Sequence, residues 1–365
     1  MHRLVAELPD LFQFNDGNRL QRPEDWPRRR DEIMEAILSI EYGHLPPQPA
    51  GIRAENLHPS AVKRFDGARY MQYRLVIEGG KQPFWFIVQL LVPTGDGPFP
   101  VVINGDGCWR YATDEVIMEV LGRGYALALF NRTEIVPDNY RSERDTALYL
   151  TYPEGDFGAL AAWAWGYHRV VDFLLTQDFI DPERIAVVGH SRGGKCVLLA
   201  GATDERIAVT APNDSGCGGA GCYRWHGEGC EKVEDIMRPV PYWFTPHLAD
   251  YIGNEGAMPF DQHSLKALVA PRALVSTEAL GDLWANPTGT YQTFDAAREV
   301  YRCLGVEDRI GIWYREGEHS HGIEDWRAFL DFTDLQLRGI QTERSFTDNP
   351  FPEMARAFSW SAPGK

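Results

Sequence analysis

The sequence has no apolar run long enough to cross a membrane and no excess of positive charge. Its apolar stretches all fall short of the 18 or more residues that a membrane-spanning helix needs. Lys and Arg number 36 against 52 Asp and Glu, which gives a formal net charge of −16 at pH 7. Such a surface repels phosphate backbones. We therefore expect neither a nucleic-acid partner nor a membrane partner.

An unbroken apolar leader and metal-type cysteine spacing are also missing. The short apolar stretch at 4–6 is followed by Glu7 and Asp10, whereas a secretory leader needs about 7–15 unbroken apolar residues. This favours a cytoplasmic location, or a secreted or periplasmic one if a leader was removed. The cysteines lack the short spacing of a zinc site, and an even count in a chain of 365 residues is no disulfide framework. We expect no metal and no cofactor. The six are Cys108, Cys196, Cys217, Cys222, Cys230 and Cys303.

Short strands alternate with helices through most of the chain. Apolar runs bounded by glycine are typical of strands buried on both faces. Strand–helix alternation predicts a mostly parallel central sheet with helices on both sides, a three-layer α/β/α sandwich. Two antiparallel strands are expected before it, at 70–77 and 84–92, and a helix near 31–42. The other expected strands are 98–104, 125–130, 185–188, 207–211, 273–276 and 310–314, and the other main helices are 157–176, 193–202, 290–304 and 325–337.

The strongest local signal is a Gly-x-Ser-x-Gly motif between an expected strand and an expected helix. Gly189 and Gly193 leave room for the strained turn that lifts the hydroxyl of Ser191 above the sheet edge. The positive end of the following helix then faces any oxyanion that develops there. This context predicts a nucleophile elbow and, with it, the α/β-hydrolase fold.

A serine hydroxyl needs a general base, and in this fold the chain order is Ser, acid, His. The loop at 316–322 follows the last expected strand and carries both His319 and His321. Two acids compete to orient the base. Asp214 and Asp282 each follow an expected strand, and the generic hydrolase position favours Asp282; Glu278 is a weaker third choice.

These features divide the chain into three parts. Residues 1–60 are expected to form a helical and irregular segment packed on the body. Residues 61–340 form the α/β-hydrolase domain, with an insertion at about 215–262 over the active site. Residues 341–365 form an irregular tail.

The elbow Gly189-His190-Ser191-Arg192-Gly193-Gly194-Lys195 resembles that of the glucuronoyl esterases of carbohydrate esterase family 15, which reads Gly-x-Ser-Arg-x-Gly-Lys. Gly317-Glu318-His319 ahead of Asp325-Trp326 resembles the histidine loop of the family, and this favours His319 over His321. The resemblance covers roughly residues 85–335. Fungal members have a disulfide between cysteines just before the Ser and just after the His; His190 and Ser320 stand there in this chain, as is usual in the bacterial branch. Further matches are at 162–166, 215–220, 242–244, 261–263, 270–272 and 282–285.

The resemblance implies a role for each matched residue. Ser191 would be the nucleophile and His319 the base, and Arg192 would contribute its backbone N–H and its guanidinium to an oxyanion hole. Lys195 would bind sugar hydroxyls, Trp284 would stack on the sugar, and Glu234 would make a further polar sugar contact. Many members have the acid at the place of Asp214, and some bacterial ones also have a carboxylate at that of Asp282, so Asp214 ranks first here.

The implied activity is that of a serine carboxylic-ester hydrolase. The family cleaves esters of glucuronic acid, usually 4-O-methylated on xylan, with an alcohol such as lignin or methanol, through an acyl-enzyme and without a metal. The expected partner is therefore a small-molecule or oligosaccharide ester. A carbohydrate acetyl esterase on the same scaffold is the alternative, and a non-catalytic carbohydrate-binding protein is a third. The sequence does not set the oligomeric state.

Overall fold

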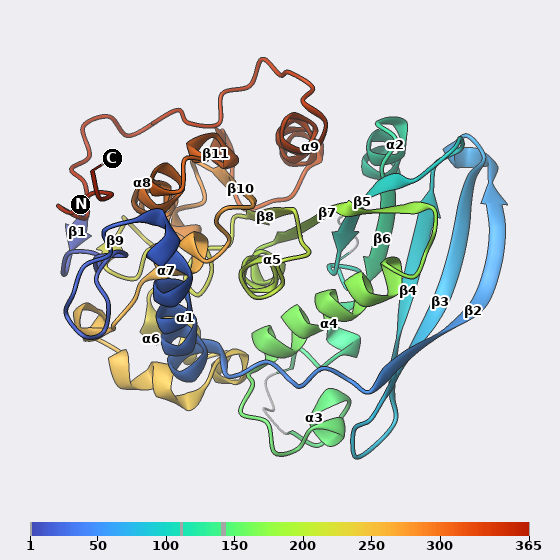
Figure 1. Ribbon diagram of the computed structural model, residues 1–365, viewed down its shortest axis with the longest axis horizontal. Coiled ribbons are helices and arrows are strands. Elements are labelled where there is room, and N and C mark those ends of the chain that lie inside the picture. The colour runs from blue at the N-terminus through green and yellow to red at the C-terminus, as the bar shows by residue number, and fades with distance from the viewer. Residues whose placement is uncertain (1, 110–111, 140–143, 365) are drawn as a thin grey trace.

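The centre of the computed structural model, which describes residues 2–109, 112–139 and 144–364, is a nine-stranded sheet (Figure 1). Its order is β11-β10-β8-β7-β5-β6-β4-β3-β2. Neighbours from β11 to β6 are parallel, whereas β4, β3 and β2 are added antiparallel. The strands are β2 Gly51–Val62, β3 Ala68–Glu78, β4 Phe84–Val92, β5 Phe99–Asn104, β6 Ala126–Phe130, β7 Ile180–His190, β8 Val209–Asn213, β10 Ala273–Ala279 and β11 Ile310–Arg315.

Helices cover both faces of this sheet and confirm the expected three-layer α/β-hydrolase architecture. In Figure 1, α2 and α9 lie on one side and α4 and α5 on the other. All six residues of β5 are buried between these layers, which explains its apolar sequence. The helices are α1 Trp26–Ile37, α2 Asp114–Gly122, α3 Leu148–Thr151, α4 Ala159–Leu174, α5 Arg192–Thr203, α6 Val233–Met237, α7 Gln262–Ala267, α8 Pro287–Cys303 and α9 Ile323–Arg338.

The N-terminal part of the chain differs from expectation. The helix expected near 31–42 begins earlier, at Trp26, where Pro27 suits the first turn, and a π-helical turn at Leu38–Tyr42 follows it. The strand β2 was not expected, and it crosses the boundary placed at residue 60. Most of its residues are exposed, so the apolar pattern that marks a buried strand is missing.

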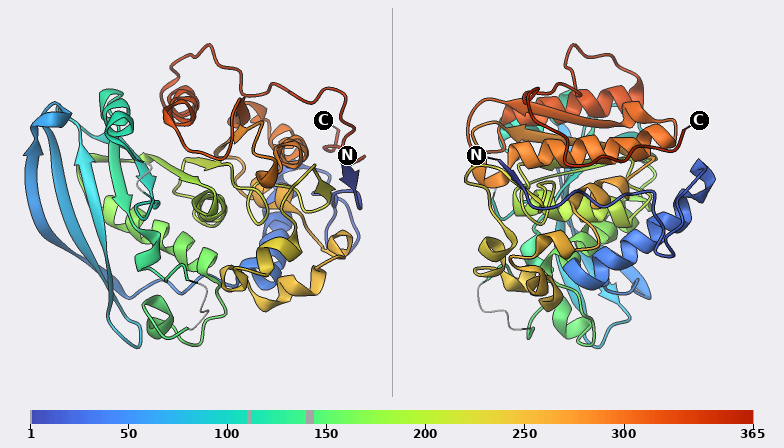
Figure 2. Two further views of the ribbon diagram at one scale, coloured as in Figure 1. Left: turned by 180° about the vertical axis from the view of Figure 1, so that it is seen from behind. Right: turned by 90° about the vertical axis from the view of Figure 1, so that its left-hand side faces the viewer.

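The two ends of the chain pack against the body. The insertion at 215–262 contains α6 and the short strand β9 (Trp225–His226), which pairs with β1 (Arg3–Leu4). Within 341–364, the part of the tail that the structure describes, no helix or strand occurs. Figure 2 shows this tail running from α9 past α8, where Arg356 forms an ion pair with Asp295. Over the part of the chain that the structure describes, we find no helix that could serve as a membrane span.

Candidate active site

Ser191 stands at the turn between β7 and α5, with φ of 56° and ψ of −121°. This is the left-handed region that side-chain-bearing residues rarely adopt, and such strain is typical of a nucleophile elbow. Close packing explains the two glycines. A Cβ on Gly189 would lie 2.5 Å from the carbonyl oxygen of Gly193, and a Cβ on Gly193 would overlap Oδ1 of Asp106. The predicted elbow is therefore present at the carboxyl end of a central strand.

A buried ion pair that was not predicted from the sequence contacts the backbone of this turn. Asp106 follows β5 and pairs with Arg132, and neither side chain has exposed surface. Oδ2 of Asp106 accepts the backbone N–H of His190 at 2.9 Å. Burial raises the pKa of Asp106, and the charge of Arg132 opposes the shift. Gly105 and Gly107 flank Asp106 in the sequence, and a Cβ on either would lie within 2.8 Å of Tyr167 or Phe130.

His319 reaches this turn from the loop after β11, and its partner is Asp282. Nδ1 of His319 is hydrogen-bonded to Oδ2 of Asp282, and the other Asp282 oxygen accepts the backbone N–H of Ala285 at 3.3 Å. Asp282 is buried, whereas the imidazole is 44% exposed. The hydrogen bond to Asp282 raises the pKa of His319 above its ordinary value, and burial opposes this rise. The pair can therefore accept a proton from the side that faces solvent.

Two further histidine rings connect His319 to the elbow and to α9. The ring of His190, next to Ser191, lies 4.4 Å from that of His319, centroid to centroid. The ring of His321 stacks against those of His190 and Trp326, with centroid distances of 5.6 Å and 5.2 Å. Burial lowers the pKa of His190 to about 3, and it also lowers the pKa of His321. Both rings are therefore neutral at physiological pH, and His321 is buried where it cannot serve as an open base.

Asp214 lies beside the same imidazole but has other partners. Its Oδ1 accepts the backbone N–H of Ala279 at 2.7 Å, and its Oδ2 lies 3.3 Å from Nη2 of Arg315. Burial raises the pKa of this carboxyl group. The hydrogen bond to the imidazole thus belongs to Asp282, whereas the sequence analysis ranks Asp214 first. Carboxylate oxygens of Asp214 and Asp282 and a ring nitrogen of His319 lie within 4.8 Å of one another. A cation bound by these three side chains would compete with the hydrogen bonds just described.

Arg192 lies directly after Ser191, and its guanidinium contacts one carboxylate and two indole rings. Its Nη1 donates to Asp138 at 2.8 Å, and Asp138 also accepts from the Tyr242 hydroxyl and the Trp243 indole N–H. The guanidinium carbon lies 5.3 Å from the Trp109 ring and 5.0 Å from the Trp243 ring. Burial raises the pKa of Asp138, but these hydrogen bonds outweigh it and the pKa lies below its ordinary value. The Arg192 guanidinium is thus fixed by Asp138, Trp109 and Trp243.

A second polar cluster lies one helical turn along α5. Nζ of Lys195 donates to the carbonyl oxygens of Ser215 and Cys217, both at 2.5 Å, and lies 3.8 Å from a carboxylate oxygen of Glu231. The backbone N–H of Glu231 donates to the carbonyl oxygen of Trp284 at 3.0 Å, and Trp284 is 54% exposed. Burial raises the pKa of Glu231, and the charge of Lys195 opposes the rise. This cluster presents an ammonium, a carboxylate and an aromatic face together.

Glu234, the carboxylate that the sequence analysis selects for this place, has a different environment. It lies in the first turn of α6 and pairs with Arg238, one turn further along, at 2.8 Å. Both side chains are more than half exposed. Glu231, just before the helix, makes the contacts to Lys195 and Trp284 instead. The two glutamates are three residues apart in a loosely matched segment, so spacing alone does not separate them.

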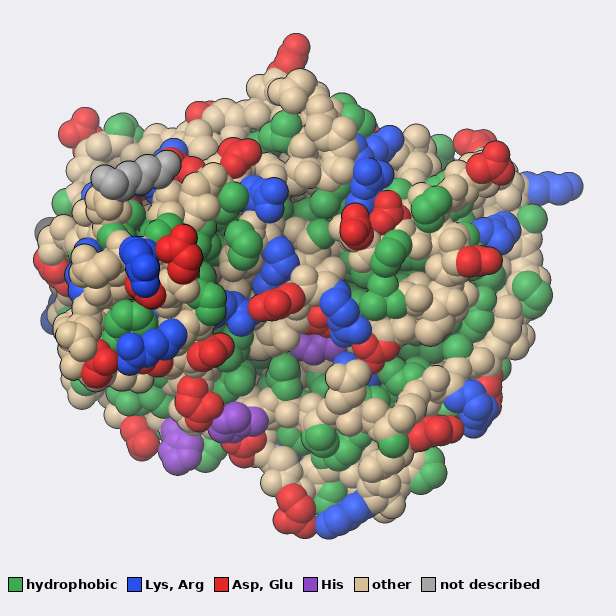
Figure 3. Space-filling model, in the orientation of Figure 1, with side chains coloured by type: hydrophobic (Ala, Val, Ile, Leu, Met, Phe, Trp, Pro, Cys, Tyr) green, Lys and Arg blue, Asp and Glu red, His purple; other side chains and the backbone are tan. Residues whose placement is uncertain are grey.

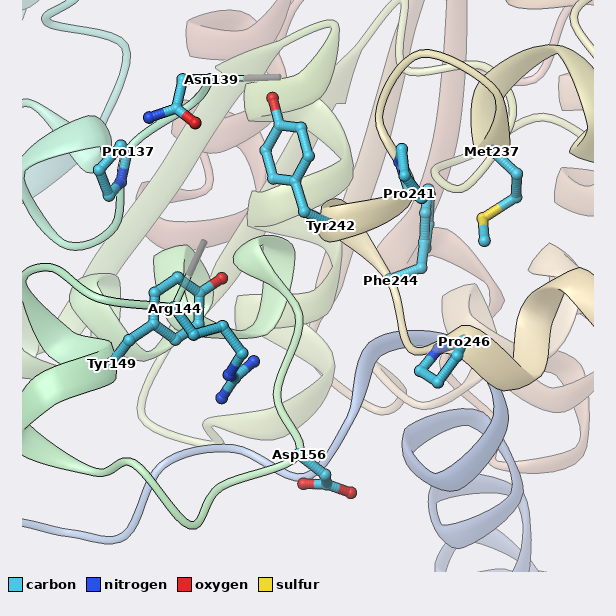
Figure 4. Close-up of a pocket in the computed structure, with 10 residues that line it drawn as sticks. All are labelled: Pro137, Asn139, Arg144, Tyr149, Asp156, Met237, Pro241, Tyr242, Phe244 and Pro246. Atoms are coloured by element: carbon cyan, nitrogen blue, oxygen red, sulfur yellow. The ribbon is translucent and has the colours of Figure 1, made fainter. Parts of the chain in front are cut away.

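Two hollows adjoin these clusters. One of about 520 Å³ is lined by Trp284, His226 and Lys232, among others. The other, of about 280 Å³, is drawn in Figure 4, where Tyr242 lies between Asn139 and the proline and aromatic side chains of the insertion. Tyr242 links this hollow to Arg192 through Asp138. Figure 3 shows acidic and basic side chains interspersed over the face in view, without a large patch of either sign.

Comparison with known proteins relates this arrangement to one family. A family model described as "Glucuronyl esterase, fungi" matches residues 75–305. A 4-O-methyl-glucuronoyl methylesterase from Podospora anserina is 36% identical over 328 residues, which cover 87% of this chain and 64% of that protein. The chain thus spans slightly less than two thirds of that relative.

Two solved structures are similar over nearly the whole chain. A carbohydrate esterase family 15 glucuronoyl esterase from Caldicellulosiruptor kristjansonii has a TM-score of 0.86 and 31% identity, covering 99% of this chain and 98% of that one. A mutant glucuronoyl esterase from Sporotrichum thermophile, in complex with methyl 4-O-methyl-beta-D-glucopyranuronate, has a TM-score of 0.77 and 25% identity, covering 93% and 90%.

Proposed function

The chain belongs to the glucuronoyl esterases of carbohydrate esterase family 15, and on this premise we propose that it hydrolyses glucuronic acid esters by serine catalysis. The substrate class is a uronate ester of a carbohydrate, with methyl 4-O-methyl-glucuronate as its simplest member. The observation that carries the proposal is that Asp282 and His319 lie next to the turn that contains Ser191. Asp282 is hydrogen-bonded to His319, and the ring of His319 packs against that of His190, which precedes Ser191 in the chain.

In the proposed reaction, Ser191 Oγ attacks the acyl carbon of the uronate ester while His319 takes its proton. The carbonyl oxygen becomes an oxyanion, which the backbone N–H at the start of α5 and the cation of Arg192 stabilise; a good donor contributes about 3–4 kcal/mol in such sites. The bond to the alcohol breaks, and His319 gives its proton to the leaving oxygen. The product left on the protein is an ester of Ser191.

Water then attacks the acyl carbon of that ester, and His319 takes the proton of the water. The bond to Ser191 Oγ breaks, the serine regains a proton from His319, and the uronic acid leaves. Asp282 holds the imidazole in the tautomer that leaves Nε2 free to accept, and it stabilises the imidazolium that forms in each half.

Recognition of the sugar is assigned to the Lys195 cluster. An ammonium donates hydrogen bonds to sugar hydroxyl groups, and a carboxylate accepts hydrogen bonds from them. An exposed indole offers a flat apolar face for a pyranose ring. The contacts among Lys195, Glu231 and Trp284 support this assignment.

The test is hydrolysis of methyl 4-O-methyl-glucuronate, compared with acetylated xylose and p-nitrophenyl acetate. We expect the uronate ester to be preferred; a much faster turnover of the acetyl esters would favour the acetyl esterase instead. Ser191→Ala and His319→Ala should each lower kcat by about 10⁴- to 10⁶-fold, while exposed controls, Ser359→Ala and His247→Ala, should leave it unchanged. Ordinary turnover by either site variant would refute the mechanism.

A further inference from the structure

Arg315 ends β11, directly before the loop that carries His319, and its side chain is 14% exposed. The guanidinium is enclosed by that loop. Nη1 donates to the carbonyl oxygens of Glu316 at 3.1 Å and Glu318 at 3.2 Å, and Nη2 donates to the carbonyl oxygen of Ser320 at 2.8 Å and its hydroxyl at 2.9 Å. Since Glu318 and Ser320 are the two neighbours of His319, the backbone is held on both sides of the imidazole.

The remaining contacts of Arg315 connect the loop to the body. Nε donates to Oδ1 of Asp325 at 2.7 Å, in the first turn of α9, and Nη2 lies 3.3 Å from Oδ2 of Asp214, after β8. Asp325 also accepts the backbone N–H of Gly322 at 2.8 Å, where the loop ends. One guanidinium therefore joins the loop, the start of α9 and the end of β8.

The same network extends to the elbow. Nδ2 of Asn213 donates to Asp325 at 3.3 Å, and Oδ1 of Asn213 lies 2.5 Å from Nδ1 of His190. His190 in turn packs its ring against His319. Polar contacts and ring packing thus connect the loop to His190, the neighbour of Ser191.

The chemistry of the side chain suits this task. A planar guanidinium has five N–H donors in a fixed fork and cannot lose its charge, whereas an ammonium has three donors at one point. The five donors of Arg315 serve carbonyl, hydroxyl and carboxylate oxygens in different directions. Its charge also opposes the rise in pKa that burial causes in Asp214 and Asp325.

We propose that Arg315 is a positioning residue that holds His319 in reach of Ser191 and Asp282, and that Asp214 acts through Arg315 instead of through a hydrogen bond to the imidazole. This inference rests on the proposed function, because the reaction needs His319 at that point. Asp214 has its two oxygens engaged by Ala279 and Arg315, so its contribution is to hold the guanidinium.

The experiment compares Arg315→Met, Arg315→Lys, Asp214→Asn and the double variant Asp214→Asn/Arg315→Met. Arg309→Lys is the matched control, since Arg309 lies just before the other end of β11 and its Nη1 donates to the carbonyl oxygen of Pro271 at 3.3 Å, away from the His319 loop. Thermal unfolding shows which variants fold. Two readouts follow: kcat and KM on methyl 4-O-methyl-glucuronate, and the far-downfield proton resonance of the imidazole Nδ1–H, assigned by its loss in His319→Gln.

A displaced reacting group costs about 100-fold in rate, so Arg315→Met should lower kcat by about that factor and leave KM within about threefold. Arg315→Lys keeps the charge and is the test variant if Arg315→Met does not fold. Its kcat should fall about tenfold because an ammonium reaches fewer of the oxygens. The imidazole resonance should disappear in Arg315→Met. It should persist in Asp214→Asn, and the double variant should be no slower than Arg315→Met, as for residues that act as one unit.

Two results would overturn the inference. One is an Arg315→Met protein whose kcat stays within threefold of the wild type and whose resonance is kept. The other is an Asp214→Asn protein that loses the resonance and is slower than Arg315→Met, because Asp214 would then act on His319 directly. The resonance needs no substrate, so these results remain distinguishable from a protein that simply does not cleave uronate esters.

Discussion

Replacing Asp282 by Asn should separate the two acids that stand near His319. The carboxylate accepts the imidazole Nδ1–H, whereas an amide N–H in the same place would donate to Nδ1 and move the proton to Nε2. His319 could then no longer accept the proton of Ser191. In a comparable triad, loss of the carboxylate with the geometry kept costs about 10⁴-fold in kcat, or about 5 kcal/mol.

The neighbouring carboxylate offers little compensation in this structure. Asp214 lies close enough to share a site with the imidazole, but its oxygens are engaged by Ala279 and Arg315. Asp214→Asn should therefore cost only about tenfold, in line with the loss of a charge-assisted hydrogen bond. The ratio between the two variants measures which carboxylate orients the base.

The assay is kcat/KM for methyl 4-O-methyl-glucuronate between pH 5 and pH 9, for wild type and both variants. In the proposed mechanism His319 acts as the neutral imidazole, and the hydrogen bond to Asp282 raises its pKa. Activity of the wild type should thus rise with pH through a value above that of an ordinary histidine, and this limb should move to lower pH in Asp282→Asn. An Asp282→Asn enzyme within tenfold of wild type, with an unmoved limb, would refute the reasoning.

Two other predictions concern a buried acid and the sugar site. Burial raises the pKa of Glu41 to about 7, so its contribution to the free energy of unfolding is complete below its unfolded pKa and is lost as pH rises through 7. Urea unfolding at pH 4.5 and pH 8 should show that the free energy of unfolding of the wild type falls by about 3 kcal/mol more than that of Glu41→Gln. An equal fall in the two proteins would contradict the raised pKa. Glu231→Gln should raise KM for the uronate ester by about tenfold, a typical cost of losing a charged hydrogen-bond partner, while the exposed Glu234→Gln should not; equal effects on initial-rate curves would argue against the Lys195 cluster as the sugar site.

The parts of this molecule that local sequence determines could be predicted from it. The elbow depends on glycines at fixed offsets from Ser191, and the buried strands depend on apolar runs; both can be recognised in a single sequence. The strand β2 could not be recognised, because most of its residues are exposed and carry polar side chains. Its place at the edge of the sheet is determined by pairing with β3, a contact between segments that have no pattern in common.

The choice between the acids could not be made from sequence for a related reason. The strands β8 and β10 are parallel neighbours, so Asp214 and Asp282 emerge at the same edge of the sheet and approach one imidazole. What separates them is the position of a third strand. Arg315 ends β11, which pairs with β10, and its guanidinium occupies Oδ2 of Asp214 while Asp282 remains open to His319. In the proposed mechanism the role of each carboxylate thus depends on Arg315, which lies more than 30 residues further along the chain than either acid and belongs to no motif around them.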